Sequence, residues 1–109
     1  MGRLRLDLAT DGATTAVQVI GEVDLATSPE LRECLSGLEG VVVVDLAGVS
    51  FLDSSGLNAL IGSKKQLAAT GGTLRLHGAR PNVRAVFDVM GMSEWFGLDD
   101  PGEPSGDDS

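Results

Sequence analysis

A nearly unbroken apolar run at residues 41–46, opening with four valines, most constrains how this chain can fold. Valine is β-branched and favours strands. A strand pattern without regular polar alternation is typical of the middle of a sheet that is covered on both faces or nearly so. A short link through Gly48 then leads to Phe51 and Leu52. We therefore expect a central, buried strand around which the other elements pack.

Two further strand patterns precede this run. In residues 3–8, leucine alternates with arginine and aspartate, a period of two that is typical of a strand with one face in water. After the turn signal Asp11-Gly12, residues 15–23 are rich in β-branched side chains and predict a second strand. The two strands are expected to pair as a hairpin.

A helical pattern lies between the second strand and the valine run. Apolar side chains in residues 31–38 recur at i, i+3, i+4 and i+7. The start of this helix fits two frames. Thr27 with Glu30 makes a capping box, whereas Ser28 followed by Pro29 makes an N-cap with proline in the first turn. The residues do not decide between the two.

Glycine and proline mark the bounds of the helical patterns. Gly37 or Gly40 would end the first helix. The second is expected to follow Ser55 and to run to about residue 69, before a Gly-Gly pair. Pro81 opens the third, whose core face extends to Met90.

A strand at residues 73–77 separates the last two helices and completes the order ββαβαβα. Strands that alternate with helices indicate right-handed βαβ crossovers, and the opening hairpin makes the sheet mixed. Residues 94–98 are expected either to add a short strand or to pack Trp95 and Phe96 against the core. The predicted fold class is therefore α/β with a mixed sheet.

Length and charge suggest one domain at residues 1–98, followed by a disordered acidic tail at 99–109. The tail carries much of the net charge of −8, and neither part has the basic stripe that a nucleic-acid backbone requires. Direct binding to nucleic acid or to a membrane surface is not expected. With no signal-peptide pattern, no apolar span and one cysteine, the expected location is the cytoplasm.

The segment Asp53-Ser54-Ser55-Gly56 lies where the strand pattern gives way to the second helical pattern. At a helix N-terminus, free backbone N–H groups and the helix dipole stabilise added negative charge. A serine here is a cap, a nucleophile or a phosphate acceptor. One cap is needed and several capping side chains are present, a surplus that favours a functional role.

A catalytic role is disfavoured. A nucleophilic serine needs a general base, but His77 is the only histidine and is expected at the end of a strand. The segment also lacks the Gly-x-Ser-x-Gly pattern. One cysteine and one histidine cannot form a zinc cluster, and no phosphate-binding glycine loop is present. We expect no catalytic residue, metal or cofactor, and we expect Cys34 to be a small buried apolar residue.

Gly21-Glu22-Val23-Asp24 ends the second strand, as Asp53 follows the third. The carboxyl ends of strands form the edge at which open α/β sheets bind ligands. If the two strands are neighbours, Asp24 lies beside the Ser54 segment. If they are not, the acids of the first segment are ordinary solvated loop residues.

Residues 51–57, Phe-Leu-Asp-Ser-Ser-Gly-Leu, resemble the signature of the anti-sigma factor antagonists, which are single STAS domains. The resemblance extends to residues 21–24, 71–74 and 83–88. It implies a STAS-like fold and a partner-switching cycle. The unphosphorylated protein would bind an anti-sigma factor that is also a serine kinase, and so release a sigma factor. Phosphorylation would end the complex, and a serine phosphatase would restore it.

By the same resemblance, the serine directly after Asp53 is the phosphoacceptor, which is Ser54, with Ser55 as second choice. The switch requires the acceptor hydroxyl to be open to solvent. A second hypothesis is a structural STAS subunit that binds the ATPase of a lipid or solute transporter. It is disfavoured because a constitutive subunit needs no acceptor serine. The implied partner-facing residues are Asp24, Asp53, Ser54, Ser55, Gly56 and Leu57.

Overall fold

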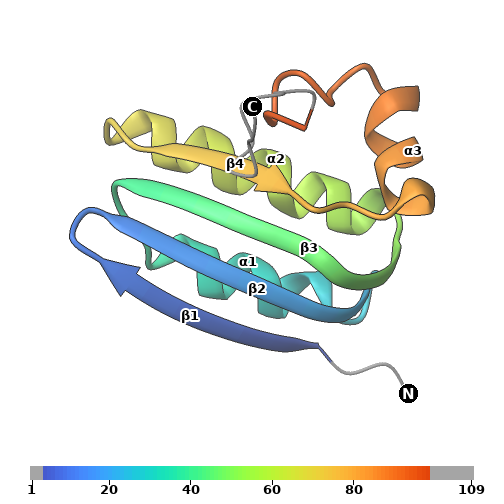
Figure 1. Ribbon diagram of the computed structural model, residues 1–109, viewed down its shortest axis with the longest axis horizontal. Coiled ribbons are helices and arrows are strands. Elements are labelled where there is room, and N and C mark those ends of the chain that lie inside the picture. The colour runs from blue at the N-terminus through green and yellow to red at the C-terminus, as the bar shows by residue number, and fades with distance from the viewer. Residues whose placement is uncertain (1–3, 99–109) are drawn as a thin grey trace, which may run out of the picture.

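The computed structural model describes residues 4–98, which form a four-stranded mixed sheet with helices packed against one face (Figure 1). The strand order is β1-β2-β3-β4, in which β1 is antiparallel to β2 and the other pairs are parallel. The predicted order ββαβαβα is confirmed. The elements are β1 (Arg5–Asp11), β2 (Thr14–Val23), α1 (Ser28–Ser36), β3 (Val41–Leu52), α2 (Ser54–Ala69), β4 (Thr73–His77) and α3 (Pro81–Val89).

The predicted hairpin joins β1 to β2. Asp11 pairs with Thr14, which leaves Gly12 and Ala13 in the turn. Gly12 has φ +64°, in the left-handed region that glycine adopts without strain. Leu8 is 47% exposed, because the helices do not extend over this part of the edge strand.

The valine run is part of a longer strand than predicted. β3 continues from Val41 to Leu52, so the expected link at Gly48 lies inside it. β2 follows β3 with register shifts between Gln18 and Ile20 and between Gly21 and Glu22. Such bulges let two strands stay paired while they bend.

The prediction that β3 is covered on both faces is wrong. Val42, Val44 and Leu46 are fully buried, whereas Val41 is exposed and Val43 is half-buried on the other face. The crossovers β2–α1–β3 and β3–α2–β4 advance in the same direction across the sheet. Because both are expected to be right-handed, they place α1 and α2 on the same face. The other face is left to solvent.

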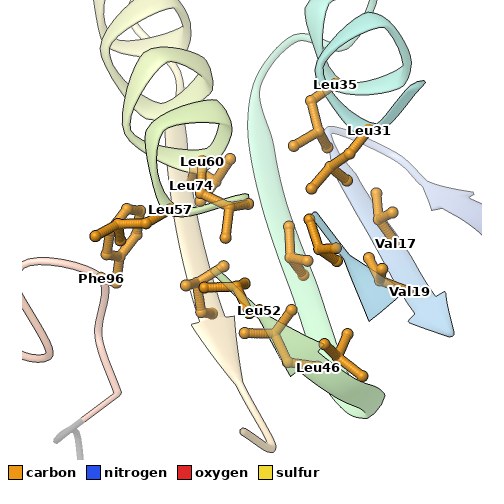
Figure 2. Close-up of a cluster of buried hydrophobic side chains, with 14 of the residues drawn as sticks. Val17, Val19, Leu31, Leu35, Leu46, Leu52, Leu57, Leu60, Leu74 and Phe96 are labelled. Carbon is orange, nitrogen blue, oxygen red and sulfur yellow. The ribbon is translucent and has the colours of Figure 1, made fainter. Parts of the chain in front are cut away.

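The hydrophobic core lies between the sheet and the helices (Figure 2). Leu31 and Leu35 reach it from α1, and Leu57 and Leu60 reach it from α2. This single cluster fixes both helices against the strands. Within residues 4–98, no helix has the length and apolarity that crossing a bilayer requires.

Residues 94–98 form turns, not the short strand that was one of the two expectations. Phe96 is fully buried and meets the ring of Phe87 edge-on, with centroids 5.3 Å apart. Its carbonyl accepts a hydrogen bond from Leu76 N at 2.8 Å. Trp95 stays 42% exposed under Lys64, whose Nζ lies 5.1 Å from the ring centroid. Burial lowers the pKa of Lys64.

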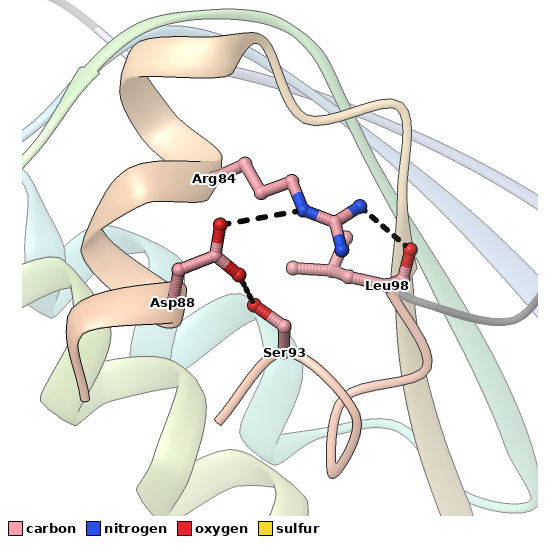
Figure 3. Close-up of polar contacts among 4 residues, drawn as sticks. All are labelled: Arg84, Asp88, Ser93 and Leu98. Carbon is pink, nitrogen blue, oxygen red and sulfur yellow. Dashed lines mark hydrogen bonds and ion pairs between the residues drawn. The ribbon is translucent and has the colours of Figure 1, made fainter. Parts of the chain in front are cut away.

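Polar contacts also tie this segment to α3 (Figure 3). Ser93 Oγ donates a hydrogen bond to Asp88, and Arg84 Nη1 donates one to Leu98 O at 3.0 Å. Arg84 Nε lies 3.6 Å from Asp88 Oδ2. These contacts and the Phe87–Phe96 pair hold α3 in place beside α2. The predicted tail at residues 99–109 lies outside the described residues.

Candidate functional site

The loops that carry Asp24 and Asp53 meet at one edge of the sheet, because β2 and β3 are parallel neighbours. Val23 pairs with Leu52, and Asp53 N donates to Val23 O at 3.2 Å. The adjacency that the sequence left open is therefore present. Any partner that reaches Ser54 also approaches the loop of Asp24.

Asp53 is the N-cap of α2. Its Oδ1 accepts hydrogen bonds from Ser55 N at 2.8 Å and from Gly56 N at 3.1 Å. This bonding satisfies donors that would otherwise be unpaired in the first turn. The surplus of capping residues is resolved, because the aspartate caps the helix and, within residues 4–98, neither serine hydroxyl is used as a cap.

Ser54 is the first residue of α2 and is exposed, whereas Ser55 is half-buried. Neither hydroxyl makes a hydrogen bond to another residue of the described chain. Ser54 thus meets the requirement that the acceptor be open to solvent. Its position at a helix N-terminus is favourable for added negative charge, although Asp53 lies next to it.

Asp24 has a clear structural role. Its Oδ1 accepts hydrogen bonds from Ala26 N at 3.0 Å and from Thr27 N at 3.1 Å. Thr27 is the N-cap residue of α1, but its hydroxyl donates to Glu22 O at 2.7 Å and caps no helical N–H group. Of the two frames that the sequence left open, neither is found in full: Thr27 and not Ser28 is the N-cap, proline lies in the first turn, and the capping box with Glu30 is absent. The Thr27 hydroxyl instead stabilises the turn between β2 and α1.

Gly56 and Leu57 are both buried, at the point where the start of α2 packs against the sheet. A Cβ on Gly56 would lie 2.6 Å from Val23 Cγ1 and 3.1 Å from Val23 O. Glycine lets the start of α2 approach the end of β2 this closely. The place of Ser54 next to the Asp24 loop depends on that approach.

Gly56→Ala is expected to lower the free energy of unfolding by about 1–2 kcal/mol, since overpacking outweighs the better helix propensity of alanine. Gly62→Ala in the same helix is the matched control. A Cβ there meets the flexible guanidinium of Arg32, at 2.8 Å from Nη2. The control should be neutral or slightly stabilising. Urea unfolding of both variants tests this, and equal stability would contradict the close contact at Gly56.

An apolar groove lies between α2 and α3, directly beside Ser54. Its volume is about 520 Å³. Val89 is 84% exposed and Met90 is 55% exposed on its wall. The groove was not predicted, and the expected place of Met90 on the core face is wrong. The lining residues are Ser54, Leu57, Asn58, Ala85, Val86, Val89 and Met90.

His77 is distant from this groove in the fold. It ends β4, pairs with Asp45 in the register, and lines a shallow pocket on the open face of the sheet. Within residues 4–98, no hydrogen bond joins His77 to Ser54. Cys34 is half-buried rather than buried, and desolvation raises its pKa, so the thiol stays protonated at neutral pH. Within residues 4–98, His77 is therefore not placed to act as a base for Ser54.

Comparison with known proteins identifies the family of this chain. The STAS domain family matches residues 5–105. An anti-sigma-B factor antagonist of Staphylococcus epidermidis is 35% identical over 95 residues, which are 84% of this chain and 88% of the relative. The solved structure of the unphosphorylated anti-sigma factor antagonist SpoIIAA has a TM-score of 0.73 at 26% identity, and the match covers 85% of this chain and 84% of that one. The phosphorylated form of SpoIIAA from Bacillus has a TM-score of 0.67 at 26% identity, with coverage of 85% and 87%.

Proposed function

Because this chain belongs to the STAS domain family, we propose that it is an anti-sigma factor antagonist that switches partners according to its phosphorylation. The unphosphorylated protein binds an anti-sigma factor and thereby releases a sigma factor. Phosphorylation ends that complex. The names of its relatives support this role, as does its similarity to a protein solved in both phosphorylation states.

The exposure of Ser54 is the observation that assigns the proposed phosphorylation to one residue. Its side chain is exposed at the start of α2, and Asp53 already supplies the cap. An exposed hydroxyl with no structural duty is available to a kinase. We assign Ser54 as the phosphoacceptor, with Ser55 disfavoured because it is half-buried.

The partners follow from this cycle. The anti-sigma factor is an ATP-dependent serine kinase, and a separate metal-dependent serine phosphatase removes the phosphate. The chain itself is a regulatory protein of the cytoplasm, with its binding domain at residues 1–98 and an acidic tail at 99–109. The alternative of a structural subunit on a transporter ATPase is disfavoured, since it gives the exposed Ser54 hydroxyl no role.

Incubation of the purified chain with an anti-sigma kinase and ATP tests the assignment. Mass spectrometry is expected to locate one phosphate on Ser54. Ser54→Ala should abolish labelling, whereas the matched variant Ser55→Ala should keep it, since only the first removes the exposed hydroxyl. Phosphate on Ser55, or labelling that survives Ser54→Ala, would contradict the assigned acceptor.

A further inference from the structure

The two edges of the sheet differ in how their backbone groups are used (Figure 1). At β4, Leu76 N donates to Phe96 O at 2.8 Å, and Leu74 O accepts a hydrogen bond from Lys64 Nζ at 3.1 Å. At the other edge, no element within residues 4–98 pairs with the outer side of β1. An open strand edge is a template on which another strand can pair.

Every second residue of β1 directs its backbone N–H and C=O groups away from β2. Asp11 and Thr14 close the two-residue turn and face each other across the hairpin. Counting back from that pair, the residues whose backbone groups point outward are Leu6, Leu8 and Thr10. Leu8 is also the middle residue of the strand, and its side chain is 47% exposed. The centre of the open edge therefore combines outward backbone groups with exposed apolar surface.

The charges of β1 make the strand complementary to a copy of itself. In an antiparallel pair centred on Leu8, Arg5 lies opposite Asp11 of the second copy, and the symmetry repeats this contact at the other end. Asp7 lies opposite Ala9, so no like charges face each other. Opposite charges placed directly across two strands stabilise the pair, whereas like charges destabilise it.

Other registers are less favourable. A pair centred on Asp7 sets that carboxylate against its own copy, and a pair centred on Ala9 sets Asp7 against Asp11. A pair centred on Leu6 matches the charges but overlaps the two strands only at residues 5–7. Charged side chains usually protect an edge strand from pairing. Here they exclude the adjacent registers and allow the one that pairs the whole strand.

We propose that two copies of this chain pair along β1, antiparallel about a twofold axis at Leu8, and form one continuous sheet. Strand addition at a sheet edge is a general mode of protein recognition. The two Leu8 side chains cover each other at the axis. Ser54 follows β3, and β2 lies between β3 and this edge, so both proposed acceptors remain accessible in the dimer. Because each copy contributes a single strand, the dimer is weak and reversible.

Sedimentation equilibrium at chain concentrations up to about 1 mM tests the pairing. The average mass is expected to rise with concentration from that of one chain toward that of two. Leu8→Lys sets two cations against each other at the axis and should raise the dissociation constant of the dimer at least about tenfold. The residue is partly exposed, so the thermal midpoint of unfolding should hardly change.

Val89→Lys is the matched control, because it places the same charge on another exposed apolar residue, at the groove between α2 and α3. It should dimerise like wild type. The mass of one chain over the whole concentration range overturns the proposal. So does a dimer that Leu8→Lys leaves intact or that Val89→Lys dissociates.

A charge exchange tests the register. Asp11→Arg sets cations opposite each other at both ends of the pair and should raise the dissociation constant roughly five- to tenfold. Adding Arg5→Asp restores opposite charges and should return the constant to within about threefold of wild type. A double variant that binds itself no more tightly than Asp11→Arg overturns the proposed pairing.

NMR on a mixture of labelled and unlabelled chains locates the contact. Asp7 and Ala9 of opposite copies form a pair without mutual backbone hydrogen bonds, whose Cα atoms are about 4.5 Å apart. An intermolecular contact between their Hα atoms is expected, and amide exchange at Leu6, Leu8 and Thr10 should slow as concentration rises. Intermolecular contacts confined to another surface overturn the proposal. Phosphate labelling of Ser54 is independent of these results, so the proposed function stands or fails separately.

Discussion

Ser54→Asp is expected to weaken binding of the anti-sigma kinase by about 10- to 100-fold, equivalent to about 1.4–2.7 kcal/mol. Ser54 lines the apolar groove and directly follows Asp53, and the loop of Asp24 lies at the same edge of the sheet. A fixed charge there must be desolvated in the complex or meet like charge, and both are unfavourable. Calorimetry with the same kinase measures the loss.

The phosphate itself should act more strongly than aspartate, because it adds a charge of about −1.5 to −2. Full reversal of binding from 99:1 to 1:99 needs a difference in affinity of about 10⁴-fold. We expect the phosphorylated chain to approach that limit. The discrimination arises in the complex, since the start of α2 already tolerates negative charge.

Ser54→Asn is the matched control, because asparagine has nearly the size of aspartate without its charge. It is expected to bind within a fewfold of wild type. An equal loss for both variants would show that shape, not charge, drives the switch. Backbone NMR shifts on phosphorylation should stay near Ser54 and the Asp24 loop, and widespread shifts would contradict a switch without refolding.

Local patterns in the sequence were enough for the element order and for the position of the Ser54 segment. Hydrophobic periodicity, glycine stops and the surplus of caps at residues 53–55 are each contained in a few neighbouring residues. The adjacency of Asp24 and Asp53 could only be conditional, because it depends on which strands pair. The parallel pairing of β2 with β3 supplied that information.

Two wrong predictions concern the burial of β3 and of Met90. Burial depends on parts of the chain that are distant in the sequence. The valine run predicted a strand covered on both faces, but the two crossovers share one face and Val41 remains exposed. Helical spacing placed Met90 on the core side of α3. The helix buries only Val83 and Phe87, whereas Val89 and Met90 line the groove beside α2. The groove forms where two helices meet, so no local pattern could reveal it.

The segment after α3 is needed to hold that helix in place, because α3 itself buries few side chains. Phe96 fills the space beside Phe87 and is fully buried, although no regular element contains it. From the sequence, residues 94–98 were expected either to form a short strand or to pack Trp95 and Phe96 against the core. The packed position makes Phe96 the member of the C-terminal segment whose loss should matter most.

Phe96→Ala is expected to lower the free energy of unfolding by about 3–5 kcal/mol, as for other truncations of buried aromatic residues. The free energy of unfolding of a small domain is only about 5–15 kcal/mol in total, so this variant should be only marginally stable. Trp95→Ala is the control. Because the Trp95 ring is partly exposed, its loss should lower the free energy of unfolding by much less. Urea unfolding gives both values. Hydrogen exchange should show faster opening of α3 in Phe96→Ala, because the ring of Phe87 loses its neighbour. Equal losses in the two variants would mean that α3 is held by its contacts with α2 and β3 alone.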